Sequence, residues 1–112
     1  MRFAKESVPE SADFNGLTPA FMQWPKGMDA STLLEGLPGG LCHCPHWGYA
    51  LKGVMLVKYS DGSAEEIRGG DVYYLPAGHT ALIKDDFASV EFNPKREFRE
   101  VMAHVAKKMQ GK

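Results

Sequence analysis

The stretch WGYALKGVMLVKYSDGSAEEIRGGDVYYLPAGH, residues 47–79, decides the fold. It consists of short apolar runs that are divided by glycine and by polar turn residues. Asp61-Gly62 is the strongest short signal for a β-hairpin, because this pair adopts the tight turn that joins antiparallel strands. Short strands at regular turn spacing are typical of antiparallel sandwiches and barrels. The stretch therefore predicts an all-β antiparallel fold and not a parallel sheet.

The segments on either side extend this pattern. Residues 79–84 (HTALIK) and 87–94 (FASVEFNP) predict two further strand segments with a turn between them. Upstream, residues 18–25 (TPAFMQWP) predict a short strand that ends at a proline. Residues 29–40 offer an N-cap and a glycine stop, which predicts one or two helical turns. Residues 1–17 predict a loose entry with at most one edge strand.

The last segment, KREFREVMAHVAKKMQ, predicts a helix over about residues 95–110. Its apolar residues recur at helical spacing and form one stripe on a charged helix: Phe98, Val101, Met102, Val105 and Met109. Such a stripe packs against the chain's own barrel or against a partner subunit. We therefore expect a single domain, residues 1–112, with a barrel over about 18–94 and this helix against it.

Composition excludes several classes of function. The chain has 112 residues, of which 44% are hydrophobic and 24% charged, with a formal net charge of -1. This balance is typical of a soluble globular protein and predicts no binding to nucleic acid or to a membrane. The first residues lack the apolar middle of a signal peptide. We expect a cytoplasmic protein whose thiols stay reduced.

The densest chemistry lies in LCHCPHWGY, residues 41–49, which holds both cysteines of the chain and two of its four histidines. Alternate residues of a strand face the same side, so Cys42, Cys44 and His46 are expected to share one face. His43 is expected on the other face. The alternatives to a metal site are buried core thiols, a redox or disulfide pair and a catalytic thiol. Pro45 is the residue that could break strict alternation.

Two segments together resemble a known family. GGLCHCPHWGYALKG (39–53) and GGDVYYLPAGH (69–79) are similar to the two-motif core of the small cupins, which are antiparallel jelly-roll barrels. A closer likeness is to small bacterial cupins with a Cys-x-Cys-Pro-His-Trp-Gly-Tyr segment. The resemblance covers roughly residues 38–93. It implies a jelly-roll barrel whose interior holds a metal ion.

The resemblance also implies where ligands should lie. In this chain the usual cupin ligand positions fall on Gly40, Cys42, His46 and Ala81, so only two of them hold ligand side chains. Cys44 and His79 each lie two residues from a ligand position and keep the same parity. The implied metal set is therefore Cys42, Cys44, His46 and His79. Thiolates with imidazoles favour zinc as the divalent metal ion, with nickel or ferrous iron as alternatives.

Other residues are candidates for roles beside this set. A pocket formed by Trp47, Tyr49 and Tyr73 would serve as a wall for a small-molecule ligand, although aromatic residues in a small barrel are more often core. Glu91 is the acid to consider as a proton carrier near the metal, provided that it faces inward in place of its apolar neighbours. His104 is expected to be a surface or packing residue.

Two functions remain open from the sequence. Four protein ligands would saturate zinc and favour a metal-binding or ligand-binding module, used for sensing or stability. Three ligands would leave a position for substrate and favour a metal-dependent enzyme, of hydrolase, isomerase or dioxygenase type, acting on a small molecule. The sequence identifies no catalytic residue. A homodimer is expected, with contacts through residues 18–24 and the stripe of the last helix.

Overall fold

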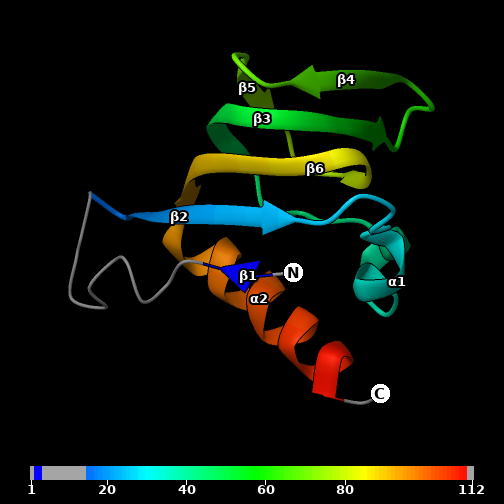
Figure 1. Ribbon diagram of the computed structural model, residues 1–112. Coiled ribbons are helices and arrows are strands. Elements are labelled where there is room, and N and C mark those ends of the chain that lie inside the picture. The colour runs from blue at the N-terminus through cyan, green and yellow to red at the C-terminus, as the bar shows by residue number, and fades with distance from the viewer. Residues whose placement is uncertain (1, 4–14, 111–112) are drawn as a thin grey trace.

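The computed structural model of the protein describes residues 2–3 and 15–110. Its strands, all antiparallel to their partners, are β1 (Arg2–Phe3), β2 (Leu17–Trp24), β3 (His46–Tyr59), β4 (Ala64–Arg68), β5 (Val72–Leu75) and β6 (His79–Pro94). The chain between β2 and β3 forms α1 (Ser31–Leu34) and a 3-10 turn, η2 (Pro38–Gly40). The helix predicted at the end is α2 (Lys95–Gln110), and it runs back beneath β2 (Figure 1).

The strands form one sheet in the order β1-β2-β6-β3-β4, and β5 pairs with the first part of β3. The predicted all-β antiparallel fold with a C-terminal helix is confirmed. Closure of the barrel is not found, because β1 and β4 end the strand order in the described part of the chain. The helices cover part of the open sheet: α1 packs on β6, and α2 packs on β6, β2 and α1.

The interior holds two apolar clusters. One lies among the strands and includes Met55, Val57 and Phe87. The other lies under the helices and joins both cysteines to residues of α1 and α2: Ala30, Leu33, Leu34, Cys42, Cys44, Val101 and Val105. The helix stripe therefore packs within the chain. Ala20 and Met22 of β2 are buried as well, whereas Phe21 between them is only partly buried. The expected dimer contacts stay a prediction.

A β-bulge in the middle of β3 depends on a glycine. The pairing of β3 with β6 shifts register between Ala50 and Met55, and Gly53 lies inside this region with a φ of 89°. A Cβ atom added at Gly53 would lie 2.1 Å from the backbone oxygen of Asp86 on β6. Both the left-handed conformation and the close approach therefore require glycine.

We expect Gly53→Ala to lower the free energy of unfolding by about 3 kcal/mol, because it combines backbone strain with a main-chain clash. Gly62→Ala is the matched control, since Gly62 has a φ of 88° but nothing within 4 Å of an added Cβ. The control should lose only about 1 kcal/mol. Urea denaturation of both variants measures the difference, and equal losses would contradict the role of the bulge.

Candidate metal centre

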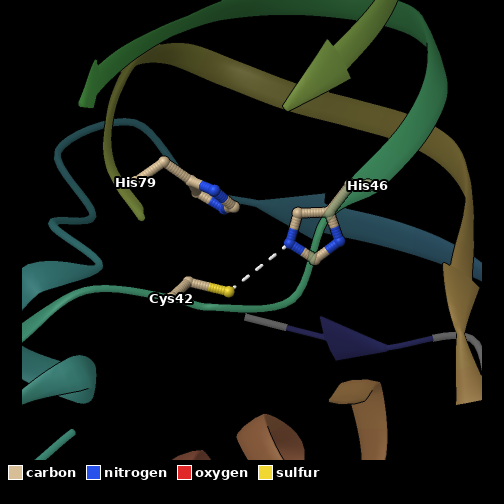
Figure 2. A group of neighbouring side chains, drawn as sticks. All are labelled: Cys42, His46 and His79. Atoms are coloured by element: carbon tan, nitrogen blue, oxygen red, sulfur yellow. Dashed lines mark hydrogen bonds between the residues drawn. The ribbon is translucent and has the colours of Figure 1, made fainter. Parts of the chain in front are cut away.

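Backbone hydrogen bonds bring the first motif against the start of β6. Cys42 forms an isolated antiparallel bridge with His79, in which Cys42 N donates to His79 O at 2.8 Å. Gly78 N donates in turn to Cys42 O at 2.8 Å. His46 begins β3 and pairs with Leu75 at the end of β5, four residues before His79. The side chains of Cys42 and His46 therefore lie beside that of His79, and the three point toward one another (Figure 2).

The expected alternation is found in the burial of this segment. Cys42, Cys44 and His46 are buried, whereas His43 is exposed and its Nε2 lies 2.8 Å from the backbone oxygen of Pro38. The parity argument is thus correct about which residues face inward. His79, at the start of β6, is buried as well.

Three of the four expected ligands point toward one another. The Sγ of Cys42 and one ring nitrogen from each of His46 and His79 all lie within 4.8 Å of each other. Cys42 Sγ is 3.5 Å from His46 Nε2, and the two imidazole rings are 5.0 Å apart at an angle of 68°. This spacing is short enough for one ion to contact all three side chains after small rotations. One thiol and two imidazoles form a donor set that suits zinc.

Hydrogen bonds at Nδ1 orient both rings. His46 Nδ1 lies 2.5 Å from Asn93 Oδ1, and His79 Nδ1 lies 2.8 Å from the backbone oxygen of Pro76. Both oxygens can only accept, so each Nδ1 carries a proton and donates it. Asn93 is itself fixed, because its Nδ2 donates to Thr18 O at 3.2 Å. The Nε2 atom is therefore the ring position free to take or release a proton, or to bind a metal, as in many histidine metal sites.

The electrostatics favour a thiolate. Burial raises the pKa of the Cys42 thiol, but hydrogen bonds from His46 and His79 and the positive charge of these rings outweigh it and lower the pKa to about 6. Burial lowers the pKa of His46, but the charge of Glu91 and hydrogen bonds with the two thiols raise it well above its usual value. The lowered pKa favours the thiolate form of Cys42, which is the form that a metal ion binds.

Glu91 faces inward, next to this group. It is 6% exposed, whereas its neighbour Phe92 is 38% exposed, so the polar residue takes the interior position on β6. Its Oε1 is 3.5 Å from His46 Nδ1, and the Tyr73 hydroxyl donates to its Oε2 at 2.6 Å. Burial and the charge of Glu91 raise the pKa of Tyr73, which therefore stays protonated and donates.

A glycine makes room for this contact. Gly48 of β3 pairs with Tyr73 on β5 and with Glu91 on β6. A Cβ atom at Gly48 would lie 2.5 Å from Tyr73 Cζ and 2.6 Å from its hydroxyl oxygen. The tyrosine side chain thus crosses β3 over the glycine to reach the carboxylate. Sequence patterns alone do not indicate this role of Gly48 or the role of Asn93, although Asn93 shares the parity of Glu91 on the same strand.

Cys44 is outside the three-residue group. It is fully buried, and its thiol donates to the backbone oxygen of Pro45 at 3.3 Å. Burial raises the pKa of Cys44, in contrast to Cys42. The residues from 41 to 45 lie outside the described strands, so alternation determines which side each faces but not where its sulfur points. A four-ligand set that includes Cys44 stays a prediction.

A cavity of about 80 Å³ adjoins the group. Its wall is mostly apolar, with contributions from β2, α1 and α2, and Cys42, His46, His79 and Glu91 form part of its polar side. The aromatic residues expected to form a pocket do not line this cavity. Trp47 and Tyr49 are each 45% exposed on the opposite face of β3, and Tyr73 is buried among the strands. Alternate residues of a strand face opposite sides, so Trp47 and Tyr49 point outward where His46 points inward.

Comparisons with known proteins were consistent with this fold. No family model and no curated protein matches the chain. A cupin superfamily protein from Desulfitobacterium hafniense is similar over 74% of this chain and 71% of its own, with 16% identity and a TM-score of 0.56. An RmlC-like cupin from Shewanella frigidimarina is similar over 75% and 72%, with 21% identity and a TM-score of 0.51. A cupin-2 domain containing protein from the same organism covers 74% of each chain, with 12% identity and a TM-score of 0.51.

At these identities the likeness is one of fold, and the fold of this chain is that of the cupins. The Cys-x-Cys-Pro-His variant of the first motif is not tested by these structures and stays a prediction. In the described part of the chain, no helix has the length and apolar character needed to cross a bilayer.

The lowered pKa of Cys42 has a direct test in metal-free protein. Ultraviolet absorbance of thiolate should rise with a midpoint near pH 6 in the chelator-treated protein, because the thiolate persists well below the usual cysteine range. Cys44→Ser should keep this step and Cys42→Ser should lose it. A first step only in the ordinary range of cysteine would contradict the assignment.

Proposed function

We propose that this protein binds one divalent transition-metal ion, zinc by preference, through Cys42 Sγ, His46 Nε2 and His79 Nε2. The observation that carries the proposal is the convergence of these three side chains, each with one ligand atom within 4.8 Å of the others. Both rings are also fixed by oxygen acceptors at Nδ1, which leaves Nε2 for the metal. The function is therefore that of a metal-binding cupin with a small-molecule or metal-related role.

The chemistry of the donors supports zinc. Thiolate is a soft ligand and imidazole a borderline one, and zinc accepts both in tetrahedral sites. Cys42 needs little driving force to lose its proton, since its pKa is about 6. Nickel and ferrous iron would also accept this donor set. A cytoplasmic location, where thiols stay reduced, is part of the proposal.

A second candidate function, a metal-dependent enzyme acting on a small molecule, is favoured by the cavity. Three protein ligands leave one position of a tetrahedral ion for another molecule. A bound divalent ion would supply Lewis acidity at this position. The apolar wall would exclude water around a small substrate, and Thr80 Oγ1, buried against the cavity, has no hydrogen-bond partner in the described structure.

The number of protein ligands separates the two functions. With Cys44 as a fourth ligand the ion would be closed to substrate, and the protein would act as a binding or stability module. The Cys44 thiol would have to turn away from Pro45 O for this arrangement. The structure as described groups three ligands, which supports an open position facing the cavity.

Metal content tests the proposed ligands. Untagged protein should carry close to one divalent ion per chain and should lose thermal stability when the ion is removed, because ligands that bind the folded state stabilise it. Cys42→Ala, His46→Ala and His79→Ala should each lower the metal content sharply. Elemental analysis by mass spectrometry measures the occupancy, and circular dichroism confirms that each variant folds.

The matched control is His43→Ala, which removes an exposed imidazole from the same segment. It should leave the metal content unchanged. An equal loss from His43→Ala and His46→Ala would refute the argument from strand faces, and full occupancy in all three ligand variants would refute the site.

A further inference from the structure

The cavity beside the metal centre combines an apolar wall with few polar groups. Strands of the sheet and both helices line it, mostly through methionine, leucine, valine and phenylalanine side chains. The polar residues that line it are the three candidate ligands together with Thr80, Ser89 and Glu91. A cavity of this composition suits a molecule that has an apolar body and very few polar atoms.

Two hydroxyl groups of the cavity lack a partner. Neither Thr80 Oγ1 nor Ser89 Oγ has a hydrogen-bond partner in the described part of the chain, and Ser89 is fully buried. Both residues belong to β6, and Thr80 directly follows the candidate ligand His79. Because a buried hydroxyl is stabilised by a hydrogen bond, these groups mark where a polar atom of a ligand can be held.

The charges around the cavity favour a neutral ligand. No lysine or arginine is among the described residues that line it, whereas Glu91 brings a carboxylate. The positive charge of a divalent ion would be matched by this carboxylate and by the Cys42 thiolate. An anion added to the balanced group would stay uncompensated in apolar surroundings, which is strongly unfavourable. Phosphorylated and carboxylated molecules would therefore be poor ligands.

The volume of the cavity limits the size of the ligand. About 80 Å³ holds about three to four non-hydrogen atoms, on the scale on which an apolar cavity of roughly 150 Å³ holds benzene. Sugars and nucleosides exceed this size. They would also need more polar partners than the two free hydroxyls supply. A short, compact carbon skeleton with one polar head fits.

We propose that the cavity binds a short neutral carbonyl compound (an aldehyde, ketone or primary amide), with its oxygen at the open position of the ion and its alkyl part against the apolar wall. A carbonyl oxygen has two lone pairs, so it can contact the ion and accept a hydrogen bond from Thr80 at the same time. This inference rests on the proposed function, because the ion supplies one of these two attractions.

Nuclear magnetic resonance of zinc-loaded protein, labelled with ¹³C at its methionine methyl groups, tests the proposal. Met22, Met55 and Met102 line the cavity, and Met109, exposed on α2, is the internal reference. Acetamide should shift the resonances of the three cavity methionines and leave that of Met109 unchanged. Acetate has the same shape but carries a charge, so its dissociation constant should be about tenfold higher or more. Propan-2-ol, which lacks the carbonyl, should also bind about tenfold more weakly.

Thr80→Val tests the hydrogen bond to the ligand, because it removes the hydroxyl and keeps the shape of the side chain. Thr80 Oγ1 has no partner in the described structure, so the variant should fold and keep its zinc. The dissociation constant of acetamide should rise about fivefold. The matched control is Thr32→Val, an exposed position of α1 outside the cavity, which should leave binding unchanged. An unchanged dissociation constant in Thr80→Val would contradict the proposed contact.

The zinc content of each sample separates this inference from the proposed function. Zinc-loaded protein that binds no acetamide, or binds acetate or propan-2-ol as tightly, would overturn the inference and leave the metal site standing. Equal binding of pivalamide, which carries the same head on a bulkier body, would overturn it as well. So would acetamide binding that survives the removal of zinc unchanged, since the ion would then hold no part of the ligand. Protein that takes up no zinc would overturn both.

Discussion

The backbone bridge between Cys42 and His79 is the interaction on which the site depends. Residues 41–45 lie outside the described strands, so no ladder of hydrogen bonds fixes them. The bridge fastens this segment to the start of β6, and Cys42 thereby lies beside one histidine of the group. The pairing of His46 with Leu75 on β5, four residues before His79, brings the other histidine to the same place. Two local backbone contacts thus bring together side chains that lie up to 37 positions apart in the sequence, from Cys42 to His79.

The polar interior has consequences for the rest of the molecule. Glu91 is buried beside His46 and is held by the Tyr73 hydroxyl, and Gly48 leaves the space for this contact. A buried carboxylate needs such partners, because an unpaired charge in an apolar interior is strongly unfavourable. With polar residues inside, strand alternation leaves Trp47 and its neighbours outside. The buried polar group and the exposed aromatic residues of β3 are therefore two results of one pattern.

Part of this could be predicted from the sequence. Regular turn signals gave the antiparallel sheet, helical spacing gave α2, and strand parity gave the inward orientation of Cys42 and His46. The open sheet could not be read from these signals, because strand patterns do not show which strands pair at the edges. Cys44 was grouped with the ligands because parity specifies a face and not the direction of a thiol outside a strand.

The orientation of β6 is not evident from its local sequence. Apolar residues normally compete successfully for the interior, so Val90 and Phe92 were expected to displace Glu91. Its hydrogen bond from Tyr73 and its proximity to His46 are tertiary contacts that no local pattern reveals. Trp47 and Tyr49 were considered as pocket residues although their parity is opposite to that of His46. In this case strict use of alternation would have placed them on the outer face.

X-ray absorption at the metal edge of the loaded, untagged protein is the most direct test of the central claim, that the metal has three protein ligands and one open position. We expect one sulfur at about 2.3 Å, two imidazole nitrogens at about 2.0 Å and one further light donor that does not come from the protein. Cys44→Ser should leave this spectrum unchanged. Two sulfur ligands in the wild-type protein, reduced to one in Cys44→Ser, would contradict the account and show a closed four-ligand site.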